Sequence, residues 1–156
     1  MHHLLPLQVQ SISIAIDAEQ VQEILGERPW VLLPGARAEI PGVVSWRGRA
    51  VGLFDFAAVT EGLLPLDEKA PRARTVIVQA GASALAIPVD AVREVREVPS
   101  EALRAPRITS QRFSSSEVEL DGVVMPVFDV AAFIQSVESA DAAAVSADMP
   151  LSGALH

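Results

Sequence analysis

The sequence contains two copies of one pattern. Residues 48–59, Gly-Arg-Ala-Val-Gly-Leu-Phe-Asp-Phe-Ala-Ala-Val, return as residues 122–133, Gly-Val-Val-Met-Pro-Val-Phe-Asp-Val-Ala-Ala-Phe. Upstream, residues 14–24 are echoed by residues 87–95, and the order of the motifs is the same in both copies. A motif that returns after roughly 70 to 75 residues predicts two similar half-domains, and it argues against one sheet with a single deep catalytic cleft.

Composition and charge exclude several classes of protein. Half of the 156 residues are hydrophobic but only 4% are aromatic, so the core must consist of Val, Leu, Ile and Ala. With no Cys, the chain has neither disulfides nor thiolate chemistry. The net charge of −8, without any basic cluster, argues against nucleic-acid binding. No apolar run is long enough to span a membrane, and no basic segment precedes an apolar one at the N-terminus, so we expect a cytoplasmic protein.

The residues that carry most enzyme chemistry are missing or badly placed. His2, His3 and His156 lie at the two ends, where they could not be held as a general base or a metal site. There is no Gly-rich phosphate loop and no Gly-x-Ser-x-Gly elbow. Four aspartates stand where a strand ends and a turn begins, which favours helix capping over catalysis: Asp17, Asp55, Asp90 and Asp129. We therefore expect no catalytic residues, no metal and no cofactor.

Alternating apolar residues and turn motifs predict short strands in the first half. The expected strands are two within 5–17 around a reversal at Gln10-Ser11, one at 28–33, and a hairpin of 43–46 and 50–54 around Arg47-Gly48-Arg49. A short helix is expected over 18–25, between an Asp17 cap and Gly26, and a second short helix after Asp55.

The second half repeats this plan after a polar connector at 63–74 that contains two prolines. The expected elements are a hairpin of 75–79 and 85–89, a strand at 92–98, a loop or helical turn at 99–107, and a hairpin of 113–120 and 123–128. The Asp121-Gly122 turn of the last hairpin is the strongest such motif in the chain. Asp129 is expected to cap a last helix that ends near Val137, and 138–156 to be a disordered tail.

These elements predict a mostly β fold made of two similar five-stranded SH3-like barrels with short helices. Strands this short cannot bury both faces of an open sheet, and closure into a small barrel removes the exposed edges. We expect one domain over residues 1–137, with the first barrel at about 5–62 and the second at about 75–137.

The stretch from Pro34 to Asp55 resembles the CheW-like family of chemotaxis coupling proteins. The family pattern is an apolar Gly-Val strand, an Asn-Leu-Arg-Gly turn and an apolar strand that ends in Asp-Leu. Here the turn reads Ser-Trp-Arg-Gly, at residues 45–48. Further matches are Val-Gln-Glu-Ile at 21–24, Val-Ile-Val at 76–78, Ile-Pro-Val-Asp at 87–90 and Val-Phe-Asp at 127–129, so the resemblance covers roughly residues 5–136.

The resemblance implies two five-stranded barrels and a non-enzymatic adaptor with two partners. These are the cytoplasmic tip of a chemoreceptor (a methyl-accepting chemotaxis protein) and the regulatory domain of the chemotaxis histidine kinase, which one barrel end would contact. An acidic residue and an Arg near the receptor-facing surface fall, by motif, on Glu23 and Arg47. The two side chains could also form a purely structural ion pair, and both roles are compatible.

A groove near Glu23, Val44 and Arg47 is expected to accept a receptor helix, because helix-in-groove binding needs an apolar trough with a charged rim. The expected apolar walls are Val21, Val89 and Val98. Trp46 should point away from Arg47 if both lie on one strand, which makes it either a core residue or an exposed anchor of the interface.

Two other functions remain open from the sequence. One is a divergent CheW-like module that binds a single partner in another signalling system. The other is a small-molecule-binding β-barrel or a hydrolytic enzyme, against which the missing internal His and Cys argue. Binding to a receptor tip and to a kinase regulatory domain would distinguish these alternatives.

Overall fold

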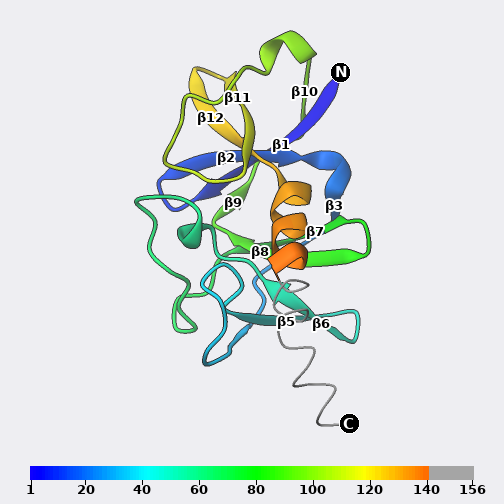
Figure 1. The fold of residues 1–156 in the computed structure, drawn as a ribbon, viewed down its shortest axis with the longest axis vertical. Coiled ribbons are helices and arrows are strands. Elements are labelled where there is room, and N and C mark those ends of the chain that lie inside the picture. Colours follow the sequence, from blue (N-terminus) through cyan, green and yellow to red (C-terminus); the bar gives the residue numbers. More distant parts are fainter. Residues whose placement is uncertain (141–156) are drawn as a thin grey trace.

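The computed structural model describes residues 1–140, which form a mostly β structure of two six-stranded sheets (Figure 1). The first sheet contains β1 (His2–Val9), β2 (Ile12–Asp17), β9 (Ala91–Val92), β10 (Arg96–Val98), β11 (Ser114–Leu120) and β12 (Val123–Phe128). The second sheet contains β3 (Val21–Leu25), β4 (Val31–Leu32), β5 (Gly42–Trp46), β6 (Arg49–Leu53), β7 (Arg74–Ala80) and β8 (Ser83–Val89). All four predicted hairpins are present.

Each sheet takes strands from both halves of the chain. In the first sheet β2 pairs in parallel with β12, and in the second sheet β6 pairs in parallel with β8. The two copies of the repeat thus exchange hairpins: β5–β6 joins β7–β8, while β11–β12 joins β1–β2. The strands of the expected barrels, 5–62 and 75–137, are therefore divided between the two sheets and do not form one barrel each.

Within residues 1–140, neither sheet closes into a barrel through backbone hydrogen bonds. In each sheet, one ion pair instead joins a strand to a turn that is not its hydrogen-bonded neighbour. In the first sheet Arg96 of β10 meets Asp121 in the β11–β12 turn at 2.7 Å, and in the second Glu23 of β3 meets Arg47 in the β5–β6 turn at 3.3 Å. The prediction of a mostly β fold is confirmed, whereas closed barrels are not.

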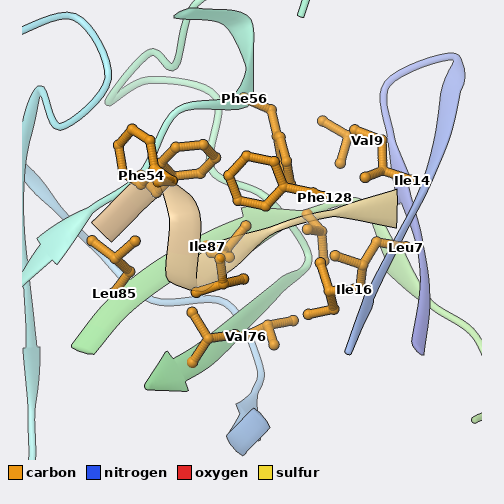
Figure 2. Close-up of a cluster of buried hydrophobic side chains, with 14 of the residues drawn as sticks. Leu7, Val9, Ile14, Ile16, Phe54, Phe56, Val76, Leu85, Ile87 and Phe128 are labelled. Atoms are coloured by element: carbon orange, nitrogen blue, oxygen red, sulfur yellow. The ribbon is translucent and has the colours of Figure 1, made fainter. Parts of the chain in front are cut away.

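The largest core cluster combines residues of both sheets, so the sheets are not independent folding units (Figure 2). All five Phe residues belong to this cluster or pack against it. Phe54 and Phe128, which occupy the same place in the two copies of the repeat, lie with ring centroids 5.1 Å apart. Phe133, from the C-terminal helix, lies 4.8 Å from Phe54. The Phe residues thus concentrate in the core that the two sheets share.

The prediction of a helix over 18–25 is wrong. Only Ala18–Gln20 forms a single 3₁₀ turn, and the chain then becomes β3, which pairs with β7. A register shift between Val21 and Glu23 interrupts the two-residue alternation of the strand. Because of this bulge, the apolar residues of the strand have the spacing of a helix, which explains the wrong prediction. Pairing with β7 makes the segment a strand.

Two other expected strands are shorter than predicted. Of 28–33, only Val31–Leu32 is a strand. The segment 92–98 divides into β9 and β10, and Val95 between them is 52% exposed. The helical turn expected within 99–107 is present at Ser100–Ala102.

Three of the four aspartates cap the turn that follows them. Asp17, Asp55 and Asp129 accept from the backbone N–H of Glu19, Ala57 and Ala132 at 2.9 Å each. Phe56–Ala58, after Asp55, is a 3₁₀ turn.

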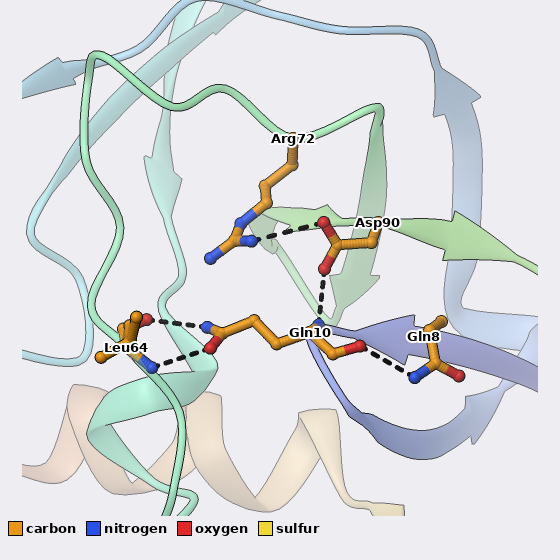
Figure 3. Close-up of polar contacts among 5 residues, drawn as sticks. All are labelled: Gln8, Gln10, Leu64, Arg72 and Asp90. Atoms are coloured by element: carbon orange, nitrogen blue, oxygen red, sulfur yellow. Dashed lines mark hydrogen bonds and ion pairs between the residues drawn. The ribbon is translucent and has the colours of Figure 1, made fainter.

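Asp90 has a different role from the expected cap. It accepts from the backbone N–H of Gln10 and from Arg72, which lies in the connector (Figure 3). The Gln10 side chain in turn bonds both backbone groups of Leu64. Asp90 and Gln10 therefore tie the connector to the β1–β2 turn.

The last described element is a helix over 130–140, shown in orange in Figure 1. It buries Phe133 and Ile134 in the shared core and continues beyond the expected end at Val137. Residues 138–140, expected in the tail, are thus helical, and 141–156 lie outside the described residues. In the part of the chain that the structure describes, no helix is long and apolar enough to cross a membrane.

Candidate functional site

The candidate site is built on the turn between β5 and β6. Arg47 and Gly48 have φ angles of +49° and +76°, and two successive positive φ values are typical of a type I′ hairpin turn. Glycine accepts this geometry without steric cost, whereas Arg47 is held in it by the pairing of Trp46 with Arg49 across the turn. The turn presents the Arg47 side chain to solvent, with 69% of it exposed.

Glu23, Trp46 and Arg47 form one contact cluster, which we call the rim triad. The Trp46 indole N–H donates to Glu23 Oε1 at 3.0 Å, and Arg47 donates to the same oxygen at 3.3 Å. The Arg47 guanidinium also lies 4.8 Å from the centre of the indole ring. The structure thus brings together three of the residues that the sequence proposed.

Strand alternation predicted that Trp46 and Arg47 point in opposite directions. The structure contradicts this, because the two side chains lie against each other. Arg47 belongs to the turn, where alternation ceases, and its guanidinium folds back over the indole. Trp46 itself is 6% exposed and packs in the core of the second sheet. It is therefore a core residue whose polar edge reaches the surface.

The expected groove is not assembled from the predicted valines. Val44, Val89 and Val98 are all buried, each in a different core cluster. Val21 is half-buried and packs against the shared core. Val44, Val89 and Val98 therefore contribute to the core of the fold, and Val44 also lies in the lining of a surface pocket beside Arg49.

Sequence reasoning missed Arg49, the second Arg of the Arg-Gly-Arg turn. Its guanidinium lies 5.3 Å from the Trp46 ring centre, so two guanidinium groups contact one indole. A guanidinium over an aromatic face is attracted by the ring quadrupole. Because Arg49 pairs with Trp46 across the hairpin, the symmetric motif around Gly48 was the signal that could have identified it.

The two carboxyl groups with shifted pKa values belong to the scaffold. Burial raises the pKa of Asp55, although the backbone N–H groups of Ala57 and Leu66 and the charge of Arg72 act in the opposite direction. The pKa of Glu117 is lowered, chiefly by the hydrogen bond from the Arg107 backbone N–H and also by Arg104. Among residues 1–140 no three His, Cys, Asp or Glu side chains gather as metal ligands.

The model of the CheW-like domain matches residues 3–138. The chain belongs to the CheW-like family. "Probable chemotaxis protein CheW" of Rhizobium etli is 27% identical over 142 residues, which are 87% of this chain and 89% of that protein.

A solved structure, scaffolding protein TtCheW from Thermoanaerobacter tengcongensis, has the same fold. Its TM-score is 0.70 at 17% identity, over 83% of this chain and 89% of that one. Proteins of the CheW-like family are scaffolds and adaptors rather than enzymes, and this chain is one of them.

Proposed function

We propose that this chain is a cytoplasmic adaptor that couples chemoreceptors to a chemotaxis-type histidine kinase. Family membership supports an adaptor in chemotaxis. The observation that carries the receptor contact is the exposed Arg47 guanidinium, which Glu23 fixes in place on a tight turn. A positioned Arg retains donors for a partner and loses less side-chain entropy on binding than a free one.

The receptor surface in this proposal is narrower than the predicted groove. It consists of the rim triad and Arg49, and Val44 packs in the same core cluster as Trp46. The kinase regulatory domain would bind elsewhere, at the end of one of the sheets. Both partners belong to the proposal, and an adaptor that binds only one of them is the alternative.

Arg47→Glu should weaken receptor binding far more than it weakens the fold. The Glu23–Arg47 pair is exposed, so its loss costs about 0–1 kcal/mol of stability. An anchoring Arg at an interface is typically worth at least about 2 kcal/mol, which is a loss of about 30-fold in affinity. The measurements are the melting temperature and the affinity for a soluble coiled-coil fragment that carries a chemoreceptor tip.

Arg28→Glu is the matched control, because Arg28 is exposed and its reversal changes the net charge by the same amount. An unchanged affinity in Arg47→Glu with an intact fold would remove Arg47 from the interface. Parallel pull-downs with the kinase regulatory domain separate the adaptor from the single-partner module, because only the adaptor retains both proteins.

A further inference from the structure

Trp46 contributes a hydrogen-bond donor at a place where the family pattern has none. The usual turn reads Asn-Leu-Arg-Gly, and Leu has no polar atom in its side chain. In this chain the residue before Arg47 is Trp, and its indole N–H donates to Glu23 Oε1 at 3.0 Å. A donor to a charged acceptor makes a stronger bond than a neutral pair.

This bond fixes Glu23 from the side of the core. The body of Trp46 is buried among the side chains of the second sheet, and its rotamer is therefore set by packing. Glu23 Oε1 receives both the indole N–H and the Arg47 guanidinium. The carboxylate thus connects a rigid core residue to a flexible surface residue.

The indole ring also acts on the guanidinium groups directly. Arg47 and Arg49 lie 4.8 Å and 5.3 Å from its centre. Arg47 is 69% exposed, and without these contacts its long side chain would sample many rotamers. The triad restricts it to one place above the turn.

We propose that Trp46 is a positioning residue, which holds Glu23 and Arg47 in the geometry that receives the partner. This inference rests on the proposed function, because it assigns Trp46 a part in the same receptor contact. It adds a role that core packing alone does not require. Phe at this position would keep an aromatic ring in the core but would leave Glu23 without the indole donor.

The first test needs no partner and uses the indole N–H resonances of the full-length ¹⁵N-labelled chain. The chain has two Trp residues, and the indole nitrogen of the other, Trp30, has no hydrogen-bond partner among the described residues. Glu23→Gln should shift the Trp46 indole N–H resonance upfield and leave that of Trp30 in place. An unmoved Trp46 resonance would overturn the proposal. Glu23 is half-buried and Gln has nearly the same shape, so this variant should fold.

The second test compares Trp46→Phe with Trp30→Phe, since both residues are more than nine-tenths buried. Trp46→Phe should lower the affinity for the receptor-tip fragment about tenfold, whereas Trp30→Phe should change it less than about twofold. In an Arg47→Ala background the effect of Trp46→Phe should largely disappear, because the group that Trp46 positions is absent. A purely structural role for Trp46 predicts equal losses in the two Phe variants.

The two tests separate this proposal from the proposed function. If the wild-type chain does not bind the receptor-tip fragment, the proposed function fails, while the resonance shift still reports the bond between Trp46 and Glu23. If the fragment binds and Trp46→Phe binds as well as the wild type, the positioning role fails alone.

Discussion

At the scale of single residues, Gly42 shows how closely β4 and β5 approach each other. A Cβ atom at this position would lie 2.0 Å from the backbone oxygen of Val31 and 2.8 Å from its carbonyl carbon. Both neighbours are backbone atoms in a paired strand, so neither can move without disturbing the β4–β5 ladder. The family pattern of Gly before an apolar strand thus has a steric reason in this chain.

Gly42→Ala should therefore destabilise the protein by about 3 kcal/mol, at the upper end of what overpacking costs. For a protein of this size, that corresponds to a fall of about 6–12 °C in melting temperature. The control is Gly26→Ala, because nothing lies within 4 Å of a Cβ atom there. Equal melting temperatures for the two variants would show that β4 can move away from the added methyl group without loss of stability.

Substitutions of Arg47 and of Trp46 should have different effects, although the two side chains are in contact. Arg47 is exposed and its exchange should affect binding, whereas Trp46 is buried and its exchange should affect both packing and binding. Burial alone thus does not separate a structural residue from a functional one. In our proposal, the hydrogen bond from Trp46 to Glu23 gives this buried residue a part in binding.

At the scale of elements, β11 holds the segment that precedes it. Glu117 on β11 is 1% exposed, and its carboxylate accepts from the Arg104 side chain at 3.0 Å and from the Arg107 backbone N–H. Arg104 and Glu117 also exchange backbone hydrogen bonds. One buried carboxylate therefore fixes the irregular segment 104–107 against the sheet.

Glu117 should make the protein sensitive to acid. Its folded pKa lies below the ordinary value of 4.5, so its contribution to stability is present above pH 4.5 and is lost as the pH falls through the lowered value. Glu117→Gln should reduce the free energy of unfolding at pH 7 and have a smaller effect at about pH 3. Urea denaturation at both pH values measures this. An equal loss at both would mean that the charge of Glu117 contributes nothing.

Asp55 acts in the opposite direction. Burial raises its folded pKa above 3.8, so its ionised form is disfavoured in the native state and acid relieves this cost. The wild type and Glu117→Gln both contain Asp55. Its effect on the free energy of unfolding therefore cancels when the two proteins are compared at one pH.

At the scale of the whole molecule, the exchange of hairpins makes the two halves depend on each other. The shared core takes residues from both sheets and from the C-terminal helix. Removal of either copy of the repeat would remove strands from both sheets. We infer that the chain folds as one unit.

Truncation of the C-terminus should reveal the true edge of this unit. A chain that ends at residue 140 should melt within a few degrees of the full chain, because residues 141–156 contain few large apolar side chains. A chain that ends at residue 129 should not fold, since it lacks the buried Phe133 and Ile134. A large loss of stability in the longer truncation would show that residues 141–156 contribute to folding.

The sequence by itself determined the local structure and the family. The two-residue turn at Asp121-Gly122, the caps at Asp17, Asp55 and Asp129, and the shared Phe-Asp motif rest on interactions between neighbours in the chain, so they could be predicted. The repeat also predicted that two similar sets of hairpins exist. Each of these features depends on residues only a few positions apart.

The tertiary structure alone decided which hairpins pair and which side chains meet. Pairing with β7, not local preference, made 21–25 a strand, and packing in three core clusters buried Val44, Val89 and Val98. Arg47 and Trp46 share one side because a turn ends the alternation that a strand would impose. The strand pairing, the burial of the valines and the contact of Glu23 with Trp46 and Arg47 all join residues far apart in sequence, and local periodicity carries no information about such contacts.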